Sequence, residues 1–364
     1  MKSNIKIGIV GCGVAGKGHL DGFLRAGGKD AWVWDVNAAA AQALASRPGV
    51  RPLTTFSELI SHPDIDAIAI ATPNRFHAEM AISALEAGKH VLLEKPMALT
   101  LEDAEAVVAT AERYGRILHV GFELRNSAFP ILVKELIASG EIGSLISAQV
   151  SHYRGHFWPH WKGRRSDGGN MYLMEDCHAI DLFRWWSGDE VAAVHAIGSR
   201  RNIVGHYEYP DTQFSTFVFR NGFVGHITDC HARSAMPEEE SRYLEPQFGH
   251  QYEYSIVGEN GALHFLPLQG VCRIYRHEPQ ENGAVVQRLV RSVDFPDYAE
   301  AIHNGDSQMS LFLEMVGGSR LPTILPHDAL QTHRVCFAAD EALRSESPVS
   351  LDEAFSDTQT GVLA

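Results

Sequence analysis

The first 120 residues alternate short apolar runs with amphipathic stretches, and this alternation restricts the fold more than any other feature of the chain. An apolar run without polar alternation is typical of a strand buried on both faces, and helices usually connect such parallel strands. Thr100 and Asp103 have the spacing of a capping box at the start of one helical stretch. The pattern predicts an α/β fold with a doubly wound parallel sheet. The predicted strands are 5–10, 31–35, 65–71, 90–94 and 116–120, with helices at 76–88 and 100–115.

The pattern changes after residue 122, where strand-like segments dominate from 190 to 292 and hairpin signals occur at 221–222 and 259–261. Runs of strands bracketed by helices favour an α+β domain with a large open, mostly antiparallel sheet. We therefore expect a dinucleotide-binding domain at 1–122 and a substrate-binding and oligomerisation domain at 123–364. Further expected elements are a strand at 145–153, helices at 127–139, 173–187, 306–318 and 326–344, and a long loop or lid at 234–250.

Composition excludes several classes of protein. The net charge is −14 and no run of Lys or Arg forms a basic stripe, so neither a nucleic acid nor an anionic membrane is an expected partner. No apolar run approaches the ~18 residues that span a bilayer, and the N-terminus lacks a signal-peptide pattern, so the expected location is the cytoplasm. The five cysteines form no CxxC pair, which argues against a disulfide scaffold or a structural zinc cluster. An open sheet must cover its exposed face, and this favours a homodimer or homotetramer.

The first predicted strand ends in GCGVAG, in which Gly11, Gly13 and Gly16 fit the pattern G-x-G-x-x-G. The first glycine permits a tight turn, the second lets a pyrophosphate approach the backbone, and the third lets the helix pack on the strand. The strand before the motif and the helix after it are the context that a dinucleotide site requires. We expect Val14 and Ala15, which open the helix, to contact the phosphates as well.

Asp35 ends the second predicted strand, 24 residues after Gly11. An acid at this place accepts hydrogen bonds from a ribose 2′-hydroxyl and repels a 2′-phosphate. No Lys or Arg follows within 36–41 to hold such a phosphate, so NAD is favoured over NADP. The alternative is that Asp35 only caps the following helix.

Lys95 lies in LLEKPM, at the carboxyl end of the predicted strand 90–94. Ligands of doubly wound sheets bind outside the carboxyl ends of the strands. A lysine that loses hydration beside a cofactor has a lowered pKa and can exchange a proton with a hydroxyl group. Pro96 ends the strand and restricts where Lys95 points. The alternative is a solvated turn, because lysine is mostly exposed.

Four ordered motifs, GCGVAG, ATPNRFH (71–77), EAGKHVLLEKPM (86–97) and GFELR (121–125), resemble the Gfo/Idh/MocA oxidoreductases, relatives of glucose–fructose oxidoreductase and inositol dehydrogenase. The resemblance implies a Rossmann domain, an open-sheet domain, and oxidation or reduction of a sugar or cyclitol carbon with NAD(P). It also implies that Lys95 bridges the substrate hydroxyl and the nicotinamide, and that Glu94 contacts the nicotinamide ribose. By the same resemblance Thr72, Pro73, Asn74 and His77 line the cofactor, and Glu123 lies near the nicotinamide, where relatives often have an amide.

The segment MEDCHAID (174–181) corresponds to a motif of such relatives in which an aspartate and, four residues later, a histidine contact the substrate. His178 matches the histidine, and Met174 occupies the aspartate position. Glu175 and Asp176 are the candidates to replace the acid. An imidazole with a pKa near 6.5 suits His178 as base or hydroxyl ligand; the alternative is a core histidine. On a regular helix Met174, His178 and Asp181 would share one face, Asp181 as a structural anchor.

The preceding loop, 152–169, is rich in Trp, His and Arg. Trp158 and Trp161 can stack on a sugar ring, and Arg154 and Arg164 can bind hydroxyl or carboxylate groups. Trp and Arg are also enriched in oligomer interfaces, and the two interpretations remain open. Residues 174–181 contain one histidine and no HxxxH spacing, so no metal is expected there.

These residues together predict an NAD-dependent dehydrogenase of a sugar or polyol, in which Lys95 and His178 handle the hydroxyl proton. Two alternatives stay open. One is a relative that cleaves a glycoside through transient oxidation and retains its NAD. The other is a non-catalytic, NAD-responsive regulator that binds protein.

Overall fold

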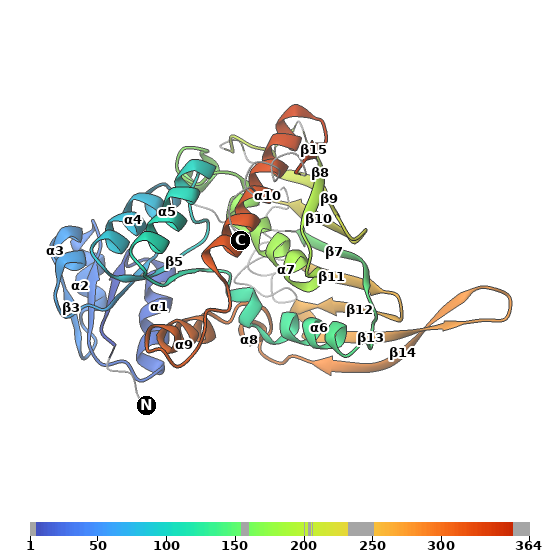
Figure 1. Cartoon of the computed structure of the whole chain (residues 1–364), viewed down its shortest axis with the longest axis horizontal. Helices are drawn as coiled ribbons and strands as arrows, with labels where there is room; N and C mark the ends of the chain where they lie inside the picture. Colours follow the sequence, from blue (N-terminus) through green and yellow to red (C-terminus); the bar gives the residue numbers. More distant parts are fainter. Residues whose placement is uncertain are drawn as a thin grey trace, which may run out of the picture. The chain divides into compact units, whose positions relative to one another are not determined.

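The computed structural model describes residues 5–153, 160–199, 201–202, 205, 207–231 and 251–351 (Figure 1). The chain forms two compact units, and each unit is assembled from three segments. The first unit comprises Met1–Asn126, Ser166–Gly169 and Asn304–His333; the second comprises Ser127–Arg165, Asn170–His303 and Arg334–Ala364. The expected lid at 234–250 lies outside the described residues.

The first unit contains a six-stranded sheet in the order β3-β2-β1-β4-β5-β6, and every adjacent pair is parallel. The predicted doubly wound parallel sheet is therefore confirmed. Strand β3 was not predicted, because it has three residues and two of them are exposed, so it shows no apolar run. The strands are β1 (Ile7–Val10), β2 (Ala31–Trp34), β3 (Val50–Pro52), β4 (Ala67–Ile70), β5 (His90–Leu93) and β6 (Leu118–Val120).

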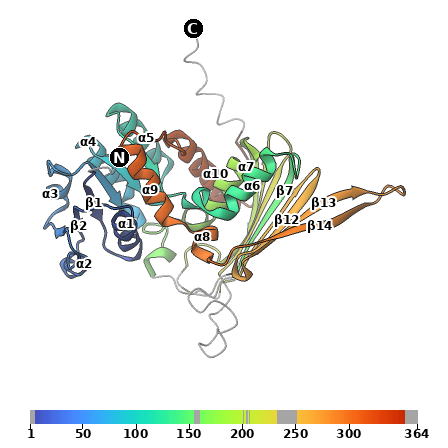
Figure 2. The same cartoon turned by 90° about the horizontal axis from the view of Figure 1, so that it is seen from below.

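Side-chain caps mark the start of several helices of this unit. The hydroxyl of Thr100 accepts a hydrogen bond from the N–H of Asp103 at the start of α5, as the sequence predicts. Helix α9 comes from the distant segment 304–333 and packs against α1, where Met309 lies over Gly22 (Figures 1 and 2). The helices are α1 (Val14–Arg25), α2 (Ala38–Leu44), α3 (Phe56–Ser61), α4 (His77–Glu86), α5 (Leu101–Arg113) and α9 (Gly305–Val316), with short 3₁₀ turns η1 (Asn74–Phe76) and η2 (Glu123–Asn126).

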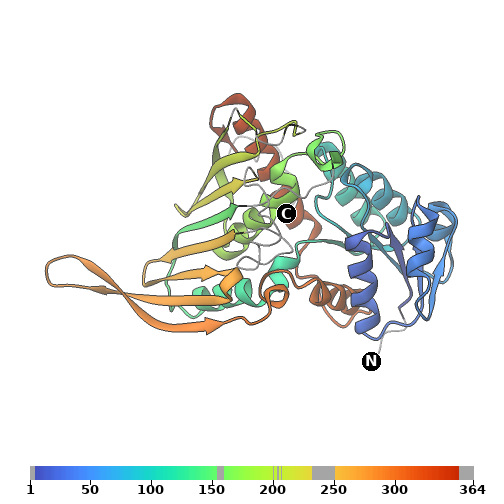
Figure 3. The same ribbon diagram turned by 180° about the vertical axis from the view of Figure 1, so that it is seen from behind.

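The second unit contains a nine-stranded sheet in the order β14-β13-β12-β11-β7-β10-β9-β8-β15. All adjacent pairs are antiparallel except β7 and β10, so the predicted open, mostly antiparallel sheet is confirmed. The strands are β7 (Leu145–Tyr153), β8 (Val191–Gly198), β9 (Thr212–Phe219), β10 (Val224–Cys230), β11 (Gln251–Gly258), β12 (Gly261–Leu266), β13 (Val271–Pro279), β14 (Val285–Asp294) and β15 (Val349–Ser350). The hairpin of β13 and β14 projects beyond the other strands (Figure 3).

Helices α6 (Ala128–Ala138) and α7 (Cys177–Ser187) cover one face of this sheet (Figure 2). The side chain of Phe129 anchors α6 by stacking on Phe265, with ring centroids 4.0 Å apart. A π-helical turn at Tyr172–Asp176 precedes α7, so the predicted helix at 173–187 is regular only in its second part. The remaining helices are α8 (Tyr298–Ile302) and α10 (Pro326–Ser345), and the unit boundary falls within α10. Among the described residues, no helix is long and apolar enough to cross a membrane.

Candidate functional site

The glycine loop has the geometry that a dinucleotide requires. A Cβ atom at Gly16 would lie 1.8 Å from the carbonyl oxygen of Gly11, so only glycine lets α1 pack this closely on β1. At Gly13, by contrast, a Cβ would meet no atom of the described residues within 4 Å. The backbone is thus open to an approaching group at the N-terminus of α1, where unpaired N–H groups attract phosphate. Val14 begins this helix and is 93% exposed.

Asp35 connects the end of β2 to the glycine loop. Its Oδ2 accepts a 2.7 Å hydrogen bond from the N–H of Cys12, and its Oδ1 accepts one from the N–H of Asn37. The cap of α2 is Asn37, whose side chain accepts a hydrogen bond from Ala39, so Asp35 does not cap that helix. Val36 beside it is 92% exposed, and no sequence motif predicts a role for it. A carboxylate and an exposed valine at this place fit the ribose and adenine of a dinucleotide.

Two buried histidines hold the turn that carries Lys95. The ring nitrogens of His77 lie 2.6 Å from the carbonyl oxygen of Pro96 and 2.8 Å from that of Thr72. The N–H of Met97 donates a 2.7 Å hydrogen bond to Nε2 of His333, whose Nδ1 donates to the carbonyl of Ala329. Both the carbonyl and the N–H of the Pro96–Met97 peptide therefore have a side-chain partner. Lys95 is half-buried, and its peptide bond to Pro96 is cis.

Glu94, which directly precedes Lys95, is half-buried and pairs with a buried histidine of α1. Its Oε1 is 2.8 Å from Nε2 of His19 on α1. Burial alone would raise the pKa of the Glu94 carboxyl, but the hydrogen bond and charge of His19 outweigh it and hold that pKa below its usual value. The nearby charge of Glu123 acts in the opposite direction. Glu94 is therefore ionised at neutral pH and offers acceptor oxygens beside Lys95.

The loop after β4 holds the predicted cofactor-lining residues together. The side-chain amide of Asn74 donates a 2.9 Å hydrogen bond to the carbonyl of Gly168, and Arg75 forms an ion pair with Asp167. The glycine pair at 168–169 therefore belongs to the first unit, although it precedes α7 in sequence. Asn74 and His77 are buried and hold backbone groups in place, whereas Pro73 is exposed.

The π-helical turn contains the first three residues of MEDCHAID, Met174, Glu175 and Asp176. Met174 is buried in a cluster with Met171, Tyr207 and Tyr209, so the position of the family's acid is occupied by apolar packing. The segment expected to be a regular α-helix contains a π-turn over Tyr172–Asp176, which includes Met174, whereas His178 lies on the regular helix α7. Asp176 accepts a 2.7 Å hydrogen bond from Gln213, while Glu175 is half-buried. His178 is buried on α7, with its ring 6.3 Å from that of His303.

The loop before this turn is described from residue 160 onward. Trp161 is half-buried, with the ammonium of Lys162 5.8 Å from its ring centroid. Arg164 is exposed, and Arg165 forms an ion pair with Asp340 in the second unit. The predicted substrate residues Arg154 and Trp158 lie outside the described residues.

The first unit also has a surface pocket that is distinct from the site at the glycine loop and Lys95. Its lining includes Ile65, His90 and Arg116, which lie at the amino ends of β4, β5 and β6. Ligands of doubly wound sheets bind at the carboxyl ends, where the glycine loop and Lys95 lie, so this pocket is not the nucleotide site.

Comparison with known proteins agrees with this geometry. Residues 5–122 match the family described as "Oxidoreductase family, NAD-binding Rossmann fold" (GFO_IDH_MocA), and residues 131–264 match the GFO/IDH/MocA C-terminal domain. The chain is 31% identical to a 1,5-anhydro-D-fructose reductase of Ensifer adhaerens over 70% of this chain and 75% of that protein. It is 26% identical to an inositol 2-dehydrogenase 3 of Saccharopolyspora erythraea over 96% of each. Among solved structures, a levoglucosan dehydrogenase in complex with NADH and levoglucosan has the same fold, with a TM-score of 0.80, 23% identity, and coverage of 96% of this chain and all of that one.

The position of Asp35 predicts a cofactor preference. Replacing Asp35 by Asn removes the charge that would repel a 2′-phosphate, so we expect the ratio of NAD to NADP affinity to fall at least about tenfold. Titration calorimetry with both cofactors measures this ratio. Asp30→Asn, which removes an acid paired with Arg51 at the opposite end of β2, serves as control. An unchanged ratio in Asp35→Asn would rule out the assigned role.

His333 predicts a loss of stability in mild acid. Burial lowers the pKa of His333 to about 4, from about 6.5 when unfolded. The unfolded chain therefore takes up a proton that the folded chain excludes. Above pH ~6.5 the neutral His333 contributes about 3 kcal/mol to the free energy of unfolding, and this contribution is lost progressively as the pH falls to ~4. Denaturant unfolding between these values should show a shallower pH dependence in His333→Gln than in wild type. The exposed His195→Gln should behave as wild type, and equal slopes in all three proteins would contradict this assignment.

Proposed function

This chain belongs to the Gfo/Idh/MocA family of oxidoreductases with an NAD-binding Rossmann fold, and on that premise we propose that it transfers a hydride between NAD and a carbinol carbon of a sugar, a sugar derivative or an inositol-type polyol. The names of its relatives denote a sugar-derivative reductase and an inositol dehydrogenase. The observation that carries the proposal is the Lys95 turn, held by His77 and His333 at the edge of the sheet where the glycine loop also lies.

NAD supplies the hydride acceptor or donor when it is bound. The open backbone at Gly13 and the N-terminus of α1 suit its phosphates, and the Asp35 carboxylate suits the hydroxyls of its adenosine ribose. The exposed Val14, which begins α1, and Val36, which follows Asp35, are assigned as apolar contacts for the nucleotide. The absence of a Lys or Arg within 36–41 supports NAD over NADP.

The hydroxyl proton is the part of the reaction that the protein itself must handle. Lys95 is half-buried, and partial loss of hydration favours the neutral amine, which is the form that can accept a proton. In oxidation, Lys95 accepts the hydroxyl proton while the carbinol carbon gives up its hydride, and His178 serves as second proton carrier or hydroxyl ligand. Such a positioned acid–base group contributes about 10²- to 10⁴-fold to the rate.

Substrate recognition is assigned to side chains of the second unit. Asp176 is held by Gln213, so the half-buried Glu175 is the better replacement for the acid that Met174 displaces. Trp161 offers a ring to a sugar face, and Arg164 offers an exposed guanidinium to hydroxyl or carboxylate groups. Arg154 and Trp158 are assigned to substrate recognition from the sequence alone.

All five cysteines are free thiols, and burial raises the pKa of Cys12 and of Cys272 to about 12. Thiols without disulfides suit a reducing compartment, and this supports a cytoplasmic location.

Lys95→Ala tests the proposal. We expect kcat to fall at least about 100-fold with NAD affinity unchanged, because the variant loses a proton acceptor and leaves the glycine loop intact. Lys29→Ala, an exposed lysine before the amino end of β2, is the matched control. His178→Asn should lower kcat and remove one ionisation from its pH profile. Wild-type turnover by Lys95→Ala with a folded, NAD-binding protein would overturn the assignment of Lys95.

A homo-oligomer is the proposed assembly. Ile197 on β8 and Phe214 on β9 are register partners on the sheet face opposite Gln213, and they remain 65% and 43% exposed. Apolar side chains that are adjacent on a broad sheet are a common feature of interfaces between copies of a chain.

Light scattering tests this assembly. Wild-type protein should have at least twice the mass of one chain, and the double variant Ile197→Glu/Phe214→Glu should shift towards one chain because it places charges in the interface. Ile131→Glu, on an exposed position of α6, should retain the wild-type mass. A monomeric wild-type protein would contradict the proposal.

A further inference from the structure

A row of polar side chains crosses the helix-covered face of the nine-stranded sheet. In the strand register His152 on β7 lies opposite Asp229 on β10, and Asp229 lies opposite Gln213 on β9. Register partners on neighbouring strands project to the same face, and all three side chains are buried. The sheet therefore places an imidazole, a carboxylate and an amide side by side beneath α7.

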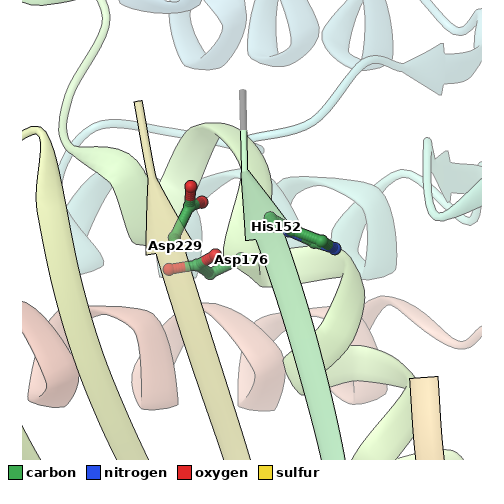
Figure 4. Close-up of side chains that lie close together, drawn as sticks. All are labelled: His152, Asp176 and Asp229. Atoms are coloured by element: carbon green, nitrogen blue, oxygen red, sulfur yellow. The ribbon is translucent and has the colours of Figure 1, made fainter. Parts of the chain in front are cut away.

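The π-helical turn adds a second carboxylate to this row. Asp176 ends that turn and is fully buried. One ligand atom from each of His152, Asp176 and Asp229 lies within 4.8 Å of the other two. Figure 4 shows the three side chains, which come from two strands of the sheet and from the turn before α7. Ligand atoms at about 2.0–2.2 Å from one metal ion lie at most about 4.4 Å apart, so only a small shift of these side chains is needed to bind one ion.

Neighbouring side chains orient these ligands. The Nε2 of Gln213 donates a 2.7 Å hydrogen bond to Oδ2 of Asp176. The buried Oε1 of Gln213 has no hydrogen-bond partner within the described part of the chain. Nε2 of the buried His231 lies 3.2 Å from Oδ1 of Asp229. Groups that fix the ligands in this way are a regular feature of metal sites.

Electrostatics favours a cation here. Two carboxylates this close cannot both remain ionised in a buried place without positive charge, because like charges and desolvation both oppose ionisation. A divalent ion balances two carboxylates and leaves His152 as a neutral imidazole ligand. One imidazole and two carboxylates suit zinc, manganese or ferrous iron, whereas calcium and magnesium prefer oxygen ligands alone.

We propose that His152, Asp176 and Asp229 form a binding site for one divalent transition-metal ion in the second unit. Asp176 is two residues before His178, so the ion ties the start of α7 to β7 and β10. The inference stands apart from the proposed hydride transfer, because it concerns metal content and stability rather than turnover.

Metal analysis and calorimetry of the full chain test this proposal. Protein purified without chelator should contain close to one equivalent of metal per chain. After EDTA treatment and dialysis, wild-type protein should bind one equivalent of ZnCl₂ or MnCl₂, and its melting temperature should rise. Asp176→Asn and Asp229→Asn, which keep the side-chain shape, should each lower the affinity at least about 100-fold. His264→Gln is the control, since His264 forms a half-exposed pair with Glu253 on the same sheet.

Two results would overturn the proposal. One is a wild-type protein that neither contains metal nor binds either ion at about 1 mM. The other is binding that survives in both folded Asn variants, since it would then come from other residues. The wild-type measurements decide this even if an Asn variant fails to fold.

Discussion

The position of Lys95 depends on how the short turn after β5 is held. The carbonyl of Pro96 and the N–H of Met97 have buried histidine partners, His77 and His333, which come from helices far apart in the sequence. A buried backbone group that loses such a partner costs about 1–3 kcal/mol, so the turn has one favoured position. Lys95 is attached to that turn, and the proton transfer that we propose for it requires a fixed position. His77 also contacts Thr72, so the loops after β4 and β5 are fixed together.

The first unit could be predicted largely from local patterns. The apolar runs gave the strands, Thr100 predicted the start of α5, and the glycine spacing predicted a loop that admits a backbone-bound phosphate. These features depend on neighbours within a few residues. Asp35 was assigned correctly to the strand end, but its hydrogen bond to Cys12 was not foreseen, because it joins two loops 23 residues apart.

Features that depend on distant residues were missed. No local pattern indicates that α9 returns to pack on α1, or that His333 accepts a hydrogen bond from Met97. The π-turn at Tyr172–Asp176 has no local signal in the sequence, which predicted a regular helix from residue 173. The prediction that no metal binds concerned residues 174–181. The candidate ligands His152 and Asp229 come instead from two strands that pair in the sheet. Register between strands distant in sequence has no local signal.

The most direct test of the central claim is the near-ultraviolet absorbance of NADH, followed while purified enzyme and NAD are mixed with inositols, aldoses, sugar acids and glycosides. The account predicts NADH formation with at least one class, and a much weaker signal when NADP replaces NAD. Binding of NAD without any absorbance change across the whole panel would contradict a sugar or polyol dehydrogenase.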